Sequence, residues 1–443
     1  MNVIKTNLNN FLAAENIINS LKDYDEDLIL SHNNVLQYTI GVFCPTCNEK
    51  MVLNGFNKHG KDKIGKINTQ RYRCQICKSN HEMSNEIIKG LISTFMKAIN
   101  HMILNMRIGY LSFENISETL SPFIQLSPDT VRNIHQRAVD GAEIDIESDL
   151  EIFHYDEQHP KKGRTQKYRL SLLDGKTRQM IVEELATELN SYVVRDFLDR
   201  HLPKDKIIFI ITDHLRMYND ILDEIRPGYI LHQHCLLHLN KNIVKDFHRN
   251  CSFKDELIKY ELLNIFYDRT EEIEYLKLAV KRELRYLSRH EKGYNRWLLD
   301  QREEFHEFVR SIEKKRRKNC KRMRIPDRMK MWSLNEAISN LDRLKVRLNE
   351  FSVSVRKRIL MIEHDWDRLT AFYHFDGAPA TNNPIENYYS CSCKQVKKKQ
   401  HRKNTGLLRQ WKLYAMKRAG LLKYDGPSMM EIIGSLIPFR LLT

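Results

Sequence analysis

Three acidic side chains stand at positions suited to holding a divalent metal ion. Asp156 and Asp213 end apolar, β-branched-rich runs that are typical of buried strands, and Glu386 lies at the start of a helical segment. Carboxylates at strand ends and at a helix start can converge on one point, and carboxylate oxygens are the ligands that Mg²⁺ and Mn²⁺ prefer. We therefore predict a catalytic site made of Asp156, Asp213 and Glu386 that works with Mg²⁺ or Mn²⁺.

The spacing of four cysteines predicts a second metal site. The segments Cys44-Pro-Thr-Cys47 and Cys74-Gln-Ile-Cys77 are two C-x-x-C knuckles flanked by strand-like residues. Each knuckle can give two thiolates to one tetrahedral Zn²⁺, so two knuckles close a structural Cys₄ site. Four unrelated buried cysteines would rarely form two such pairs, and we predict a zinc ribbon.

The charge of the chain indicates a polyanionic partner. Its 443 residues contain 72 Lys and Arg against 57 Asp and Glu, a net charge of +15. The excess is concentrated in two runs without acidic residues, 314–324 and 394–403. Such runs are often solvated tails, but these lie inside patterned sequence, so we expect them to contact nucleic acid. The phosphate-contacting residues predicted in the second run are Lys394, Lys397, Lys398, Lys399 and Arg402.

Between residues 85 and 145, apolar residues at helical spacing indicate three helices. The third begins at Ser127-Pro128, an N-cap followed by proline at the first helical position. Its exposed face carries polar side chains that can contact base edges and phosphates. A generic three-helix packing unit is the alternative, but the neighbouring zinc ribbon and acidic core favour a helix-turn-helix. The DNA-contacting residues predicted on this face are Arg132, Asn133, Gln136 and Arg137.

The middle of the chain is predicted to form a mixed sheet with helices on its faces. Three strand-like runs in series are followed by alternating helices and strands, and from Leu237 to about Tyr373 the pattern is almost wholly helical. The predicted strands are 150–155, 167–174, 178–184, 207–212 and the segment YILHQH, and the predicted helices between them are 191–199 and 216–225.

The chain exceeds the size at which a single core keeps growing, so we expect several domains. Residues 1–40 hold a weakly amphipathic helix and an acidic stretch. The predicted divisions are 1–40, the N-terminal helical segment; 41–84, the zinc ribbon; 85–145, the helix-turn-helix domain; 146–240, the first part of the catalytic core; 241–375, a helical insertion; and 376–443, the last part of the core with a basic C-terminal helix.

Sequence features of membrane and secreted proteins are missing. No charged segment followed by an apolar stretch opens the chain, and no run is long and apolar enough to span a bilayer. Nine cysteines without a secretory signal fit reduced thiols and metal binding rather than a disulfide framework. We therefore expect no membrane partner and a cytoplasmic, nucleoid-associated location.

The order and spacing of these motifs resemble those of a known group of enzymes. Asp213 follows Asp156 by 57 positions (213 − 156), and Glu386 follows Asp213 by 173 (386 − 213). A first-strand Asp, a fourth-strand Asp and a late helical Glu resemble the DDE transposases of prokaryotic insertion sequences. The segment 234–238, HCLLH, is similar to the C-x-x-H signature of Mutator-like transposases, and 381–387, TNNPIEN, is similar to the T-N-N-x-x-E box of the same group.

The resemblance covers roughly residue 150 to the C-terminus and implies a multidomain α+β protein. It implies an RNase H-like catalytic core interrupted by an all-helical insertion, behind the zinc ribbon and the helix-turn-helix. It also implies two Mg²⁺ or Mn²⁺ ions bridged by Asp156, double-stranded DNA as the substrate, and cleavage of element ends followed by strand transfer. Synapsis of two ends implies a homodimer.

Three further residues of the core have expected roles. Cys235 and His238 are two ligands, too few for a metal site, so we expect them to steady the fifth strand against the active site. Glu157 follows Asp156 directly and is expected on the opposite face of its strand.

Two other functions stay open at the level of sequence. The chain can be an RNase H-like DNA nuclease without transposition, or a sequence-specific DNA-binding regulator derived from a transposase. Intact Asp156, Asp213 and Glu386 argue against the regulator, and an assay for strand transfer distinguishes a transposase from a nuclease. Trp297 and Trp332, in the helical insertion, can stack on a flipped base or pack in a core, and packing is the simpler expectation.

The basic run at 394–403 generates a first prediction. Replacing Lys397, Lys398 and Lys399 by Ala should weaken binding to all DNA sequences and flatten the dependence of affinity on salt, because each lost phosphate contact releases about one counterion fewer. Affinities measured over a series of salt concentrations test this. An unchanged slope would mean that the run does not follow the DNA backbone.

Overall fold

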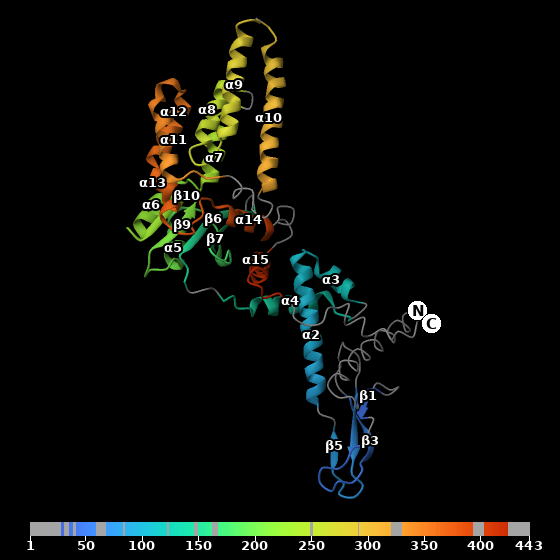
Figure 1. Cartoon of the computed structure of the whole chain (residues 1–443). Helices are drawn as coiled ribbons and strands as arrows, with labels where there is room; N and C mark the ends of the chain where they lie inside the picture. The colour runs from blue at the N-terminus through green and yellow to red at the C-terminus, as the bar shows by residue number, and fades with distance from the viewer. Residues whose placement is uncertain are drawn as a thin grey trace. The chain divides into compact units, whose positions relative to one another are not determined.

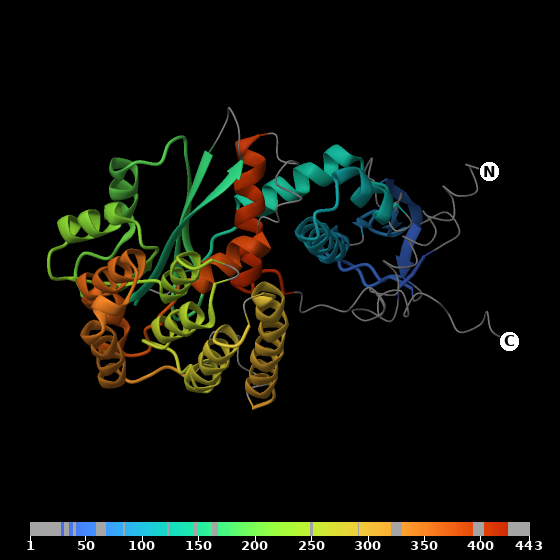
Figure 2. The same ribbon diagram turned by 90° about the horizontal axis from the view of Figure 1, so that it is seen from above.

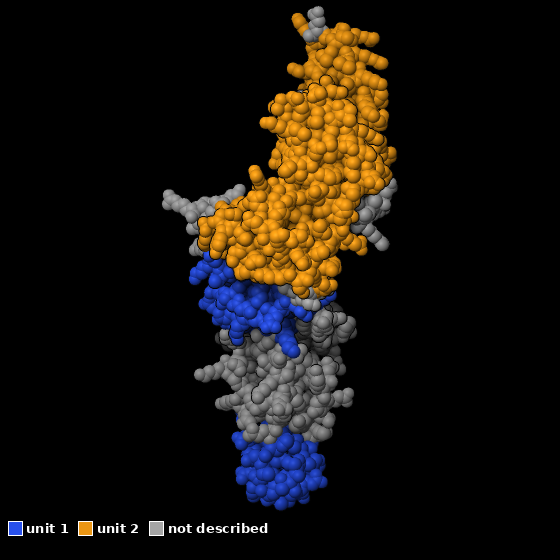
Figure 3. All heavy atoms as spheres, turned by 90° about the vertical axis from the view of Figure 1, so that its left-hand side faces the viewer, with its two compact units in different colours: residues 1–145, 399–443 blue, residues 146–398 orange. Residues whose placement is uncertain are grey.

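The structure is a computed structural model that describes most of the chain in two compact units. The first unit takes in residues 1–145 and 399–443, and the second takes in 146–398 (Figure 3). The described part holds fourteen α-helices and two five-stranded sheets, which confirms a mixed α/β chain. None of its helices is both long enough and apolar enough to cross a membrane. The described residues are 28–30, 35–38, 41–58, 68–82, 85–121, 124–145, 149–161, 167–248, 251–290, 292–319, 330–392 and 403–423.

The sheet of the first unit carries the cysteine knuckles. Its strand order is β1-β2-β4-β3, with β5 paired to β4 (Figure 1). The first knuckle lies just before β3, and the second lies between β4 and β5, so the antiparallel pairing of β3 with β4 brings them together. The strands are β1 (Leu28–Leu30), β2 (Val35–Tyr38), β3 (Val52–Lys58), β4 (Asn68–Arg73) and β5 (Asn80–Glu82).

Three helices follow this sheet, at the places that the sequence predicted. The third begins as expected, because Ser127 is its N-cap and accepts a hydrogen bond from the Thr130 amide, with Pro128 at the first helical position. Ile99, Ile103 and Ile116 are among the residues of a core shared by all three helices. The helices are α2 (Asn85–Ile108), α3 (Phe113–Leu120) and α4 (Pro128–Asp140).

The last described helix, α15 (Asn404–Arg418), also belongs to the first unit. Its Leu413 and Met416 are buried together with Leu104 of α2 and Val139 of α4. This packing differs from the sequence-based division, which assigns residues 376–443 to the catalytic core.

The second unit is built on a mixed sheet of order β10-β9-β6-β7-β8 (Figures 1 and 2). The first three strands in sequence form an antiparallel meander, β6-β7-β8, whereas β9 runs parallel to β6 and β10 runs parallel to β9. All five lie where strands were predicted, but β6 continues beyond the predicted end because its second half pairs with β7. They are β6 (Ile152–Lys161), β7 (Lys167–Asp174), β8 (Met180–Ala186), β9 (Ile208–Thr212) and β10 (Ile230–His234).

Side-chain alternation gives this sheet two different faces. Phe153 and Tyr155 of β6 pack on α5 (Ser191–His201) and α6 (Arg216–Ile225), whose positions match the predicted helices. Ile152 points to the other face, where it packs with Phe209, Ile211, Cys235 and the segment around Ala371. Residues 154 and 156 therefore share the face of Ile152.

The rest of the second unit is helical. The helices from α7 to α13 follow the sheet in sequence and form two apolar cores, one around Leu262 and Ile359 and one around Leu276 and Phe305. The chain then returns to the sheet through α14. These helices are α7 (Leu236–Lys245), α8 (Phe253–Leu263), α9 (Thr270–Leu287), α10 (Tyr294–Asn319), α11 (Leu334–Val346), η2 (Leu348–Glu350), α12 (Val353–His364), α13 (Trp366–Thr370), η3 (Ala371–His374) and α14 (Asn383–Ser392).

The turn between β7 and β8 approaches β6 so closely that only glycine fits. The Gly175 amide donates to the Ile152 carbonyl at 2.7 Å, and a Cβ at Gly175 would lie 2.2 Å from Ile152 Cγ2 and 2.8 Å from its Cβ. Ile152 is itself buried and cannot swing into solvent.

We predict that Gly175→Ala destabilises the protein by about 1–3 kcal/mol, the usual result of forcing a methyl group into a packed interior. Denaturant unfolding of the full chain measures this. The control is Lys176→Ala, which removes an exposed ion pair with Glu151 and should hardly move the midpoint. Equal midpoints for wild type and Gly175→Ala would contradict the close contact.

Candidate metal centre and carboxylate site

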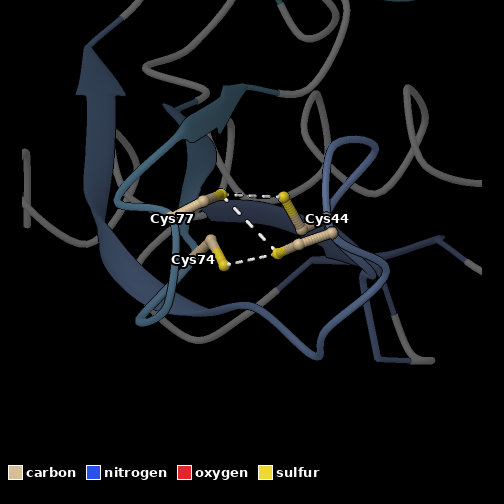
Figure 4. Close-up of side chains that lie close together, drawn as sticks. Cys44, Cys74 and Cys77 are labelled. Atoms are coloured by element: carbon tan, nitrogen blue, oxygen red, sulfur yellow. Dashed lines mark hydrogen bonds between the residues drawn. The ribbon is translucent and has the colours of Figure 1, made fainter.

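The four predicted zinc cysteines form one compact cluster. Their ligand atoms all lie within 4.8 Å of one another, and they are the one group of this kind among the described residues. Cys44 Sγ lies 3.4 Å from Cys77 Sγ, and Cys47 Sγ lies 3.4 Å from Cys74 Sγ (Figure 4). Tetrahedral Zn²⁺ with bonds of about 2.3 Å separates its sulfurs by about 3.8 Å, so the cluster fits zinc after a small outward adjustment.

The two knuckles have equivalent turns that aim the sulfurs at one point. The residue after the second cysteine of each knuckle, Asn48 or Lys78, has a positive φ of 57° or 63°. Ser79 Oγ lies 3.1 Å from the sulfurs of both Cys44 and Cys77. The Ser79 hydroxyl lowers the pKa of Cys44 to about 5, whereas the pKa of Cys47 in the same cluster is raised to about 12, so the four metal-free thiols do not ionise together.

The parallel pairing of β6 with β9 brings Asp156 near Asp213. The register pairs His154 with Ile211, an offset of 57 residues (211 − 154). The ladder ends there and β9 ends at Thr212, but the same offset continued by two positions would place Asp213 next to Asp156. Burial and the nearby charge of Asp213 raise the pKa of Asp156, which indicates that the two acids lie near each other.

Asn382 fastens the start of α14 to this face. Its side-chain amide donates to the Tyr155 carbonyl at 2.7 Å, and its Oδ1 lies 3.0 Å from His154 Nδ1. Because Oδ1 can only accept, His154 carries its proton on Nδ1, and burial lowers the pKa of His154 to about 4. The Asn382 backbone N–H donates to Cys235 Sγ at 3.1 Å, which links the T-N-N box to the C-x-x-H segment.

The middle of α14 is held by tyrosines and a buried arginine. The Tyr389 hydroxyl donates to the Asp156 carbonyl at 2.6 Å. Arg169 of β7 is fully buried, forms an ion pair with Glu183, and donates to Ser392 Oγ at 3.0 Å. Its guanidinium lies over the rings of Tyr388 and Tyr389, 5.4 and 4.9 Å from their centroids.

His238 lies between the second and third predicted carboxylates. Its Nδ1 is 2.9 Å from Asp213 Oδ1, and its Nε2 is 3.5 Å from Glu386 Oε1. The Asp213 carboxylate beside the ring raises the pKa of His238 to about 10. Lys241, one turn further along α7, places its ammonium 3.3 Å from the same Glu386 oxygen. The structure thus brings Asp156, Asp213 and Glu386 to one region, with His238 between two of them.

The donor set suits a hard divalent cation. Burial raises the pKa of Asp156 well above its usual range, and the carboxylates of Asp213, Glu157 and Glu386 raise it further. Neighbouring negative charges disfavour the ionised form of Asp156, and a bound metal cation would compensate that charge. The oxygens of the three acids are not all within 4.8 Å of one another, so binding one metal ion through all three requires them to move closer together.

Glu157 lies on the opposite face, toward α6. Its carboxylate accepts hydrogen bonds from the hydroxyls of Tyr155 and Tyr218. Glu157 therefore holds Tyr155 and Tyr218 in place on this face. Its replacement should lower the stability of the fold and change the pKa of Asp156.

The predicted DNA-contacting residues fall into two groups. Arg132, Asn133, Gln136 and Arg137 all lie on the outer face of α4, partly or fully exposed. Lys394, Lys397, Lys398, Lys399 and Arg402 lie outside the described residues.

Trp297 and Trp332, the two tryptophans considered for base stacking, have partners inside the protein. Trp297 stacks on Tyr286 with ring centroids 4.7 Å apart, and Trp332 Nε1 donates to Asn264 Oδ1 at 3.3 Å. These contacts are those of packed side chains.

Sequence reasoning missed several residues that position the carboxylates. Asn382 stands inside the T-N-N box that was recognised, but its contacts on β6 are formed across 227 or more residues of chain. Arg169 had one signal, because an arginine inside an apolar strand predicts a buried partner. His238 was expected to steady the fifth strand, and its position between two carboxylates was not foreseen.

Comparison with known proteins finds similarity to an insertion element protein. A stretch of 236 residues is 26% identical to the insertion element ISM1 uncharacterized 48.3 kDa protein of Methanobrevibacter smithii. The match covers 51% of this chain and 57% of that protein, so the likeness extends over about half of each. No protein-family profile matches the chain, and no solved structure matches it.

The cysteine cluster predicts a structural zinc ion. Cys44→Ser or Cys74→Ser removes one of four thiolates and should release zinc and unfold the knuckles, because the closed site contributes folding energy directly. Metal analysis of purified protein, with thiol titration before and after chelation, measures this. Cys391→Ser, outside the cluster, is the control and should keep the zinc content of wild type. Zinc-free protein with four reactive knuckle thiols would contradict the assignment.

Proposed function

We propose that this protein is a DDE-type DNA transposase. The observation that carries the proposal is the convergence of three carboxylates from a first strand, a fourth strand and a late helix. Asp156 lies on β6, Asp213 directly follows β9, the parallel neighbour of β6, and His238 lies between Asp213 and Glu386. Similarity to an insertion element protein supports the same conclusion independently.

Asp156, Asp213 and Glu386 would hold two Mg²⁺ or Mn²⁺ ions. When bound, such ions activate a hydroxyl nucleophile and stabilise the leaving oxygen of a phosphodiester. The three carboxylates would supply the negatively charged oxygen ligands for these ions. The cationic His238 and Lys241 offset carboxylate repulsion and lie where they can contact a DNA phosphate.

The substrate would be double-stranded DNA at the ends of a mobile element. Hydrolysis at each end exposes a 3′-hydroxyl, which then attacks a phosphodiester of target DNA in a strand-transfer step. Both steps are in-line displacements at phosphorus and can use the same carboxylates. Two copies of the protein would hold the two ends together.

The remaining parts of the chain fit this scheme. The meander β6-β7-β8 followed by two parallel strands supports an RNase H-like core, and the helices after β10 support a helical insertion ahead of Glu386. The Cys₄ cluster would be a zinc ribbon, and α2 to α4 would form the helix-turn-helix that binds element ends. Such a protein works in the cytoplasm, on the nucleoid.

Substitutions of the three carboxylates test the proposal. Asp156→Asn, Asp213→Asn and Glu386→Gln change almost no volume but each removes a charged ligand. Cleavage and strand transfer in Mg²⁺ or Mn²⁺ should fall by at least about a hundredfold, while folding and DNA binding persist. Gel assays with labelled element ends and a target plasmid measure both reactions.

The matched control is Glu224→Gln, an exposed carboxylate of α6 that pairs with Arg195 and should keep full activity. Full activity in all three site variants would place the chemistry elsewhere in the chain, whereas DNA binding without any cleavage by the wild type would leave a DNA-binding regulator. Cleavage that depends on the three acids but never yields strand transfer would identify a nuclease instead.

A further inference from the structure

One face of α4 carries a stripe of side chains without internal partners. Asn133, Gln136 and Arg137 occupy positions i, i+3 and i+4, which lie together on a helix surface. In the described part of the chain, none of the three side chains takes part in a hydrogen bond or ion pair. The stripe lines an open depression of the surface.

Both ends of the stripe are closed by ion pairs. At the N-terminal end, Arg132 Nη1 lies 2.5 Å from Asp129 Oδ1, and the guanidinium rests over the Phe113 ring, 5.3 Å from its centroid. At the C-terminal end, Arg409 of α15 donates two hydrogen bonds of 2.7 Å to the Asp140 carboxylate. The two arginines are engaged, whereas the three side chains between them are paired with no residue of the described part of the chain.

The contact with α15 fixes the orientation of α4. Lys412 adds a hydrogen bond to the Asp140 carbonyl, the C-terminal end of the helix, where a cation also complements the helix dipole. Behind these contacts lie the buried side chains of Leu104, Val139, Leu413 and Met416. A helix from the end of the chain is therefore part of the same packed unit as α2 and α4.

The chemistry of the free side chains indicates duplex DNA. Asn and Gln pair bidentately with adenine in the major groove, and Arg pairs bidentately with guanine. α15, which packs on α4, contains four basic and no acidic residues and so adds positive charge beside α4.

We propose that the sequence-reading unit is assembled from both ends of the chain: Asn133, Gln136 and Arg137 read bases, and the Asp140–Arg409 pair is a brace that positions them. Arg132 is a structural residue of α3 and α4 rather than a base reader. The inference rests on the proposed function only in taking DNA as the partner, and it concerns binding rather than catalysis.

The readers are tested by selecting binding sites from duplexes with a randomised centre, using the full chain. Asn133→Ala, Gln136→Ala and Arg137→Ala should each remove base preference at one or two neighbouring positions and weaken the selected site roughly 5- to 150-fold. Arg132→Ala should keep every base preference. Unchanged preferences in all three reader variants, or a lost preference in Arg132→Ala, would overturn the assignment.

The brace is tested by exchanging its charges. Asp140→Arg and Arg409→Asp should each lower the ratio of specific to non-specific affinity, and the double exchange should restore it. Lys417→Gln, which removes an exposed charge from the same helix, should leave the ratio unchanged. Equal losses of specific and non-specific affinity in Arg409→Asp, or no recovery in the double variant, would make Arg409 a phosphate contact and refute the brace.

These outcomes are separate from those of the catalytic proposal. A protein that selects a sequence but never cuts it would refute the transposase and keep the reading unit. A protein that cuts DNA without any selected sequence would do the reverse.

Discussion

The geometry of the carboxylate site depends on the hydrogen bonds that hold α14 against β6. The helix brings Glu386 from a segment 173 residues after Asp213, and its start is held by three hydrogen bonds of Asn382, which is fully buried. An unsatisfied buried polar group costs about 1–3 kcal/mol, so leaving any of these bonds unmade is expensive. These hydrogen bonds fix the position of α14 relative to β6 and therefore the position of Glu386.

Charge is the second constraint. Burial, together with the nearby carboxylates of Asp213, Glu157 and Glu386, raises the pKa of Asp156 well above its usual range. The fold supplies His238 and Lys241 near two of them, but Asp156 has no cationic partner in the described part of the chain. Repulsion of this kind opposes folding and is tolerated where function requires it. The buried Arg169–Glu183 pair, which is neutral overall, stabilises α14 without competing for these carboxylates.

Much of the fold follows from local sequence signals. Apolar, β-branched runs placed β7 and β9 almost to the residue, and Ser127-Pro128 placed the start of α4. Long-range pairing explains what was missed. β6 extends past Asp156 because β7 pairs with it, the packing of α15 on α4 joins residues 269 positions apart, and the contacts of Asn382 and His238 exist only after the sheet has formed. The three carboxylates could be predicted from residue type and spacing. The residues that position them could not, because their contacts form only in the tertiary structure.

The central claim is that Asp156, Asp213 and Glu386 together hold divalent metal. The most direct measurement is a crystal structure of the protein soaked in Mn²⁺, with an anomalous difference map. The account predicts manganese peaks within coordination distance of all three carboxylates, about 2.0–2.3 Å, with His238 displaced from between Asp213 and Glu386. A map with no peak at these carboxylates, from crystals that bind manganese elsewhere, would contradict it.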